Sequence, residues 1–192
     1  MRRPEQQPGL WSRLRAALAP SSATPAASNA APMQRDIEMM RRAIDQARDA
    51  QAIGEVPIGA IVYRTATGEI LGRGHNRRET DKDPAAHAEH IAMLEAARTT
   101  GDWRLNDCTV VVTLEPCPMC AGLIVNARLG RVVYGAPDPK AGAVRTLYHL
   151  ADDQRLNHRA EIIPGVLAEE CGELLTAFFR DLRHRQRRSR PS

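Results

Sequence analysis

Two short clusters of chemically active residues constrain this chain more than any other feature of its sequence. The first is His87-Ala88-Glu89, and the second, thirty residues on, is Pro116-Cys117-Pro118-Met119-Cys120. A catalytic zinc ion takes three protein ligands and keeps a fourth position open for water. It also needs a nearby base to handle the protons of that water. His87, Cys117 and Cys120 fit the three ligand positions, and Glu89 fits the base.

Both clusters fall where helices are expected to begin. Asp83-Pro84 pairs a capping residue with the residue favoured at the first helical position, so we expect a helix from there to about residue 98. Pro116-Cys117-Pro118 ends a strand and starts a second helix to about residue 127. A helix N-terminus favours negative charge and helps to hold both cysteines as thiolates. His-x-Glu followed by Pro-Cys-x-x-Cys is the signature of zinc-dependent deaminases, which predicts one zinc ion per subunit.

A Cys-x-x-Cys pair has other uses, and the surrounding residues argue against them. A redox pair of the thioredoxin type is one alternative, but Pro116 precedes the pair and a His-x-Glu helix lies upstream. A purely structural zinc site is another, and it needs a fourth ligand. Cys108 and Cys171 are the candidates for that ligand, yet each falls in an apolar pattern and is expected to be core.

Apolar periodicity and turn residues predict the rest of the fold. A strand, a helix and a second strand within about thirty residues imply a βαβ unit with a parallel strand pair. The expected elements outside the two motif helices are a helix over 34–53 that ends at Gly54, a hairpin of strands 56–64 and 69–74 around the turn 66–68, strands over 108–114, 131–135 and 160–163, and an amphipathic closing helix from 167 to 182.

The composition divides the chain into three parts. Residues 1–34 form an Arg-rich, Pro/Ala/Ser-rich N-terminal extension that we expect to be disordered. Residues 35–182 form the zinc-dependent deaminase domain, and residues 183–192 a basic C-terminal tail. The extension has three interpretations that the sequence leaves open: an organellar transit peptide, a disordered bacterial extension, or a start codon placed upstream of the true start at Met33.

Bulk properties restrict the partners and the compartment. The four cysteines show no disulfide framework, so we expect a reducing, cytoplasmic location. No apolar run is long enough to cross a membrane, and we expect no membrane partner. A net charge of +4 permits a nucleic-acid partner without requiring one.

From residue 35 to 182 the chain closely resembles the bacterial tRNA-specific adenosine deaminases. The zinc motif alone fits any cytidine or base deaminase, and the flanking motifs narrow the resemblance. Those motifs are Glu55-Val56-Pro57-Ile58-Gly59-Ala60, Asp83-Pro84-Ala85-Ala86-His87-Ala88-Glu89, Trp103-Arg104-Leu105, the run 113–122 around the cysteines, Arg131-Val132-Val133-Tyr134-Gly135-Ala136, Asn157-His158-Arg159 and Phe178-Phe179-Arg180.

The resemblance implies a three-layer α/β/α sandwich around a central mixed five-stranded sheet. It also implies a homodimer that hydrolyses adenosine to inosine at the wobble position of a tRNA anticodon stem-loop and releases ammonia. His87, Cys117 and Cys120 would bind zinc, and Glu89 would transfer the protons. Five further positions match substrate-binding residues of the family: Asn76 toward the extruded base, Asp138 and Lys140 toward the flanking nucleotides, and Asn157 and Phe179 toward the anticodon loop.

Two other functions compete with this interpretation. The first is a deaminase of free cytosine, guanine or a nucleoside on the same scaffold. The loop from Asp138 to Lys140 and the basic C-terminal helix favour RNA, because a free-base enzyme has no need of them. The second is a non-catalytic, zinc-folded RNA-binding module. Glu89 argues against it, since a structural site gains little from a carboxylate beside an open metal position.

Overall fold

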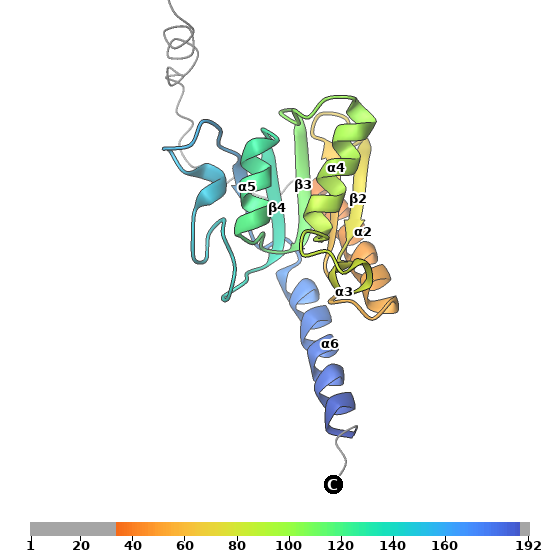
Figure 1. The fold of residues 1–192 in the computed structure, drawn as a ribbon. Helices are drawn as coiled ribbons and strands as arrows, with labels where there is room; N and C mark the ends of the chain where they lie inside the picture. Colours follow the sequence, from red (N-terminus) through yellow and green to blue (C-terminus); the bar gives the residue numbers. More distant parts are fainter. Residues whose placement is uncertain (1–33, 189–192) are drawn as a thin grey trace, which may run out of the picture.

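The computed structural model describes residues 34–188, and a five-stranded mixed sheet forms its centre (Figure 1). The strand order is β2-β1-β3-β4-β5. Strand β1 pairs antiparallel with β2 and β3, whereas β3, β4 and β5 run parallel. The strands are β1 (Gly59–Arg64), β2 (Ile70–His75), β3 (Cys108–Leu114), β4 (Arg131–Ala136) and β5 (Glu161–Ile163). The expected hairpin, the parallel βαβ pair and the mixed five-stranded sheet are confirmed.

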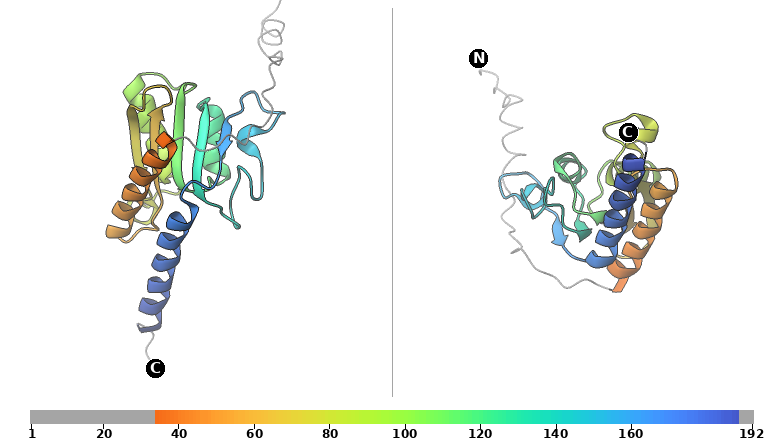
Figure 2. Two further views of the ribbon diagram at one scale, coloured as in Figure 1. Left: turned by 180° about the vertical axis from the view of Figure 1, so that it is seen from behind. Right: turned by 90° about the horizontal axis from the view of Figure 1, so that it is seen from below.

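Helices cover both faces of the sheet, as Figure 2 shows. Alternate residues of β1 point to opposite faces: Ala60 and Val62 join one buried cluster, and Ile61 and Tyr63 join the other. The first cluster packs under α4 and α5, and the second under α2 and α6. The three-layer α/β/α sandwich is therefore confirmed. The helices are α2 (Gln34–Ala52), α3 (Arg78–Asp81), α4 (Ala88–Thr100), α5 (Pro118–Asn126), the 3₁₀ turn η1 (Leu150–Asp152) and α6 (Ala168–Arg188).

Two glycines on β2 let α4 lie directly against the sheet. A Cβ atom on Gly72 would lie 2.1 Å from the carbonyl oxygen of Ala92, and one on Gly74 would lie 2.2 Å from that of Ala88. Any other residue at either position would push the helix outward. This close approach fixes where α4 begins, and hence where His87 and Glu89 lie.

The first motif helix begins later than expected. Asp83-Pro84 lies in a turn, in which the Asp83 carboxylate accepts a hydrogen bond from the Ala85 N–H at 2.8 Å. The helix starts at Ala88, with His87 as its N-cap residue. Asp83 therefore serves its own local turn instead of capping the helix, which is the usual competition for this residue type.

Two other boundaries differ from expectation. Strand β1 starts at Gly59 and not at residue 56, because Pro57 has no N–H to donate and the Ile58 N–H bonds the Val56 carbonyl. Helix α6 continues to Arg188, so the first six residues of the expected tail are helical. The N-terminal extension, apart from Gln34, lies outside the described residues. Within residues 34–188 no helix is long and apolar enough to span a membrane.

Candidate active site

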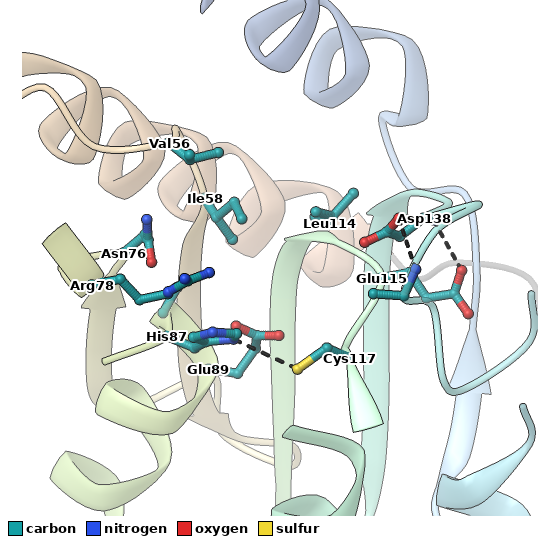
Figure 3. A pocket seen from close by; sticks show the side chains of 12 residues that line it. Val56, Ile58, Asn76, Arg78, His87, Glu89, Leu114, Glu115, Cys117 and Asp138 are labelled. Atoms are coloured by element: carbon teal, nitrogen blue, oxygen red, sulfur yellow. Dashed lines mark hydrogen bonds between the residues drawn. The ribbon is translucent and has the colours of Figure 1, made fainter. Parts of the chain in front are cut away.

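Three side chains converge where α4 and α5 begin, and Figure 3 shows two of them, those of His87 and Cys117. His87 is the N-cap residue of α4, Cys117 is the N-cap residue of α5, and Cys120 lies one turn into α5. The His87 Nδ1 atom lies 3.6 Å from the Sγ atom of each cysteine. All three ligand atoms lie within 4.8 Å of one another. The two motifs that the sequence places thirty residues apart thus form one cluster.

The cluster fits zinc in distance and in donor chemistry. Zinc–sulfur bonds of about 2.3 Å and zinc–nitrogen bonds of about 2.0–2.1 Å place the N and S ligands of a tetrahedral site about 3.6 Å apart. Among residues 34–188 no fourth histidine, cysteine or carboxylate joins the three. Cys108 and Cys171 are buried elsewhere in the core, and burial raises the pKa of each thiol to about 12. The structural-zinc alternative therefore lacks its fourth ligand in the described part of the chain.

Of the two cysteine thiols, one loses its proton readily and the other keeps it. A hydrogen bond from Cys120 lowers the pKa of the Cys117 thiol to about 4. The same hydrogen bond, with burial, raises the pKa of Cys120, and the hydrogen bond with Cys117 raises the pKa of His87. One thiolate is therefore present near neutral pH without any metal. A cation held between the sulfurs would deprotonate the second thiol as well.

Glu89 lies beside this cluster and does not belong to it. Its side chain, in the first turn of α4, is only 4% exposed. Burial raises the pKa of its carboxyl group to about 7. General acid–base catalysis works best when the pKa of the catalytic group lies near the operating pH. Its surroundings therefore suit Glu89 to both accepting and donating a proton.

A cavity of about 220 Å³ opens in front of the cluster. Val56, Ile58 and Leu114 give it apolar walls, and the described residues that line it come from five separate segments (Figure 3). The full lining is Val56, Ile58, Asn76, Arg78, His87, Ala88, Glu89, Leu114, Glu115, Cys117, Asp138 and Ala141. The expected base-binding residue Asn76 and the expected loop residue Asp138 thus face the same space as Glu89.

Asn76 is buried and held in place by Glu55. It is 5% exposed, and its Nδ2 atom donates to the Glu55 carboxylate at 3.0 Å. Sequence reasoning did not identify Glu55 as a functional residue, although it stands in one of the family motifs. Nor did it identify Arg78, whose guanidinium group points into the cavity from α3 (Figure 3).

Glu115 organises the loop that carries Asp138 and Lys140. Its buried carboxylate accepts hydrogen bonds from the backbone N–H groups of Asp138, Val144, Arg145 and Thr146, and from the Thr146 hydroxyl. Burial by itself raises the pKa of this carboxyl group, but the donors outweigh burial and lower it. Glu115 therefore fixes the backbone of the segment from Asp138 to Thr146.

The three remaining predicted substrate residues lie outside the cavity. Lys140 is exposed, two residues along the loop from Asp138. Asn157 accepts a hydrogen bond at 2.6 Å from Arg128, which follows α5 at the end away from Cys117. Phe179 lies on α6, 40% exposed, with its ring edge-on to that of Phe178. All three side chains are exposed, and their contacts with RNA stay predictions.

Comparison with known sequences agrees with the geometry. Residues 33–136 match the model of the cytidine and deoxycytidylate deaminase zinc-binding region. The chain is 49% identical over 158 residues to the tRNA-specific adenosine deaminase of Bacillus subtilis, covering 82% of this chain and 97% of that one. It is 44% identical over 152 residues to the enzyme of the same name from Haemophilus influenzae, covering 79% and 87%.

Solved structures show the same relationship. A structure from a study of A-to-I editing by tRNA:A34 deaminases at the wobble position superposes with a TM-score of 0.68 at 37% identity, covering 72% of this chain and 99% of the other. The guanine deaminase of Nitrosomonas europaea superposes with a TM-score of 0.64 at 20% identity, covering 82% and 98%. The second likeness shows a shared fold alone.

Proposed function

We propose that this chain, which belongs to the tRNA-specific adenosine deaminases within the cytidine and deoxycytidylate deaminase family, converts adenosine to inosine at the wobble position of a tRNA anticodon. The reaction consumes one water and releases one ammonia. The observation that carries the proposal is the meeting of Glu89 with the His87, Cys117 and Cys120 cluster in a cavity that Asn76 also lines. Two relatives that align with this chain over 97% and 87% of their own length are both tRNA-specific adenosine deaminases.

His87, Cys117 and Cys120 would hold the zinc ion. When bound there, the ion would lower the pKa of a water molecule far below its ordinary value, to about 7, which makes that water a nucleophile for C6 of adenine at neutral pH. Glu89 takes one proton from the attacking water and delivers it to N1 of the ring. It then takes the proton of the new C6 hydroxyl and passes it to the amine, so that the C6 carbonyl forms and ammonia leaves. Glu89 lines the same cavity as His87 and Cys117, which suits it to these transfers.

The size of the cavity supports an extruded base as the substrate. At about 220 Å³ it is smaller than the roughly 300–1,000 Å³ that drug-sized ligands occupy. A single flipped base fits such a space, whereas a base within a stacked helix cannot reach it. Apolar walls from Val56, Ile58 and Leu114, with the polar Asn76 beside them, suit a base that packs on apolar side chains and is read by hydrogen bonds.

A basic face on α6 supports RNA over a free base. Arg180, Arg183, His184 and Arg187 line one hollow of the surface, at spacings that put them on the same side of the helix. The outer half of α6 projects beyond the end of the sheet at which α4 and α5 begin (Figure 1). We infer that an RNA whose base enters the cavity runs past these cations. The loop that carries Asp138 and Lys140 would contact the same RNA, because Asp138 lines the cavity.

The test is deamination of an anticodon stem-loop with adenosine at the wobble position, with inosine as the product measured. A matched stem-loop with guanosine at that position is the negative control, and free adenosine, guanine and cytosine are the competing substrates. Turnover of the stem-loop supports the proposal. Turnover of a free base with none of the stem-loop overturns it in favour of the free-base alternative.

We also propose that the enzyme is a homodimer in the cytoplasm, where tRNA is its substrate. Large apolar side chains are exposed on α4 (Leu94), on α5 (Met119) and in the loop before η1 (Leu147 and Tyr148). Where such side chains form one patch, the patch marks an association surface. Analytical ultracentrifugation checks the oligomer, and Leu94→Asp with Tyr148→Asp should shift it to monomer. A monomeric wild type would contradict the proposal.

A further inference from the structure

The carboxylate of Glu55 is buried and bonded at both oxygens, yet it does not line the cavity. It is 1% exposed. One oxygen accepts from Asn76 Nδ2 at 3.0 Å, and the other accepts from the Thr80 backbone N–H at 2.6 Å. Glu55 thus binds Asn76, the residue predicted to contact the base, and links it to helix α3.

A carboxylate that is hydrogen-bonded to an asparagine determines which end of the carboxamide faces it. The two ends of a carboxamide are nearly equal in size, so packing alone does not distinguish them, but one end donates and the other accepts. An ionised carboxylate only accepts. Asn76 can therefore turn only its nitrogen toward Glu55. Its carbonyl oxygen and its second N–H proton are left for the cavity.

The backbone of Asn76 is fixed independently. Its N–H donates to the carbonyl oxygen of Ile58 at 2.9 Å. With the main chain held by β1 and the side chain held by Glu55, the carboxamide keeps one position and one polarity. A group preorganised in this way needs no rearrangement when the base arrives.

We propose that Glu55 is a positioning residue that sets the polarity of the Asn76 carboxamide and thereby the orientation of the base in front of Glu89. The inference rests on the proposed deaminase function. Glu55 touches neither the base nor the metal ligands, and it acts through Asn76 alone. A glutamine at position 55 would offer a donor as well as an acceptor, and Asn76 could then bind in either orientation.

The test is a double-mutant cycle on stem-loop deamination. Glu55→Gln keeps an acceptor for Thr80 and should lower kcat by roughly 10- to 100-fold, the cost of a misplaced substrate, with little change in KM, zinc content or Tm. In the Asn76→Ala background the same change should cost less than about twofold, because residues that act as one unit are non-additive. Equal losses in both backgrounds would show that Glu55 only anchors α3 and would overturn the inference.

A second variant distinguishes an effect on the orientation of the Asn76 carboxamide from an effect on the stability of the protein. Glu55→Asp also accepts only, so it should keep more activity than Glu55→Gln even where its Tm is lower. The reverse order of activity overturns the inference, and it does so even if the Glu55→Gln protein is poorly folded. A wild type that is inactive on every stem-loop instead rejects the proposed function and this inference with it. An active wild type with an additive cycle rejects the inference alone.

Discussion

The proposed metal-ligand cluster and the proposed RNA-facing rim are built in opposite ways. The rim consists of the loop residues Asp138 and Lys140 and the basic face of α6, which is lined by Arg180, Arg183, His184 and Arg187. The cluster draws three side chains from two helix starts into a space only a few ångströms across, partly or fully buried. The rim spreads its predicted contacts over a loop and the projecting half of α6, and all of them except the half-buried Asp138 are exposed. Loss of one ligand removes the whole centre, because coordination is a collective property of the set. Loss of one rim cation removes one phosphate contact of several.

The largest effect should follow from breaking the cluster. Cys117→Ala removes one of three ligands, so the protein should lose its zinc, nearly all deamination and part of its thermal stability. Elemental analysis and Tm measure the two losses. Cys108→Ala is the control, since Cys108 is a cysteine that is buried outside the cluster. A Cys117→Ala protein with a full complement of zinc would refute the ligand assignment.

The next effect separates chemistry from metal binding within the same centre. Glu89→Gln keeps the size of the side chain and should keep zinc and fold, yet turnover should fall by about 10²–10⁴-fold or more, since one group serves several proton transfers. Glu38→Gln, an exposed carboxylate on α2, is the control and should be neutral. If Glu89→Gln deaminates at a near-normal rate, the acid–base role is wrong. If it loses zinc, Glu89 is a ligand after all.

The contrast between these regions also explains what the sequence could predict. The ligand cluster was predictable because its members occur in short local motifs and a helix start constrains each of them. The sheet was predictable from apolar runs such as residues 108–114, which form β3 with the expected bounds. Neighbouring side chains of a strand point to opposite faces because the period is two, and here both faces are covered, so β1, β3 and β4 are buried along nearly their whole length.

The sequence could not reveal partners that meet only after folding. Glu55 and Asn76 are twenty-one residues apart, and no periodic pattern links them. Glu115 binds the backbone of a loop up to thirty-one residues downstream, and backbone donors leave no trace in side-chain spacing. The start of α4 was misplaced because Asp83 can cap a helix or close a turn, and the packing of α4 on Gly74 decides between them.

At the rim, the double variant Arg183→Ala with Arg187→Ala should weaken stem-loop binding without abolishing turnover at saturation. Each phosphate contact contributes about 0.7–0.9 to the slope of log affinity against log salt concentration. Two lost contacts should therefore reduce the steepness of that slope by about 1.4–1.8. Fluorescence anisotropy over a salt series measures it. An unchanged slope would exclude this face of α6 from the RNA interface.

The smallest predicted effect is that of Lys140→Ala, and it tests whether the rim extends to the loop. Lys140 stands exposed two residues from Asp138, which lines the cavity, so its charge would meet the backbone next to the extruded base. Backbone contacts fix register without reading sequence. Affinity should fall for every stem-loop alike, and the salt slope should flatten by about 0.7–0.9.

Arg98→Ala is the control, because Arg98 is also an exposed cation, in the last turn of α4 at the far end of the helix from His87. A change equal to that of the control would remove the loop from the interface and leave α6 as its basic side. If the Lys140→Ala protein instead loses turnover that saturating RNA does not restore, Lys140 acts in the catalytic step and not only in RNA binding. This loop would then belong to the buried centre and not to the rim.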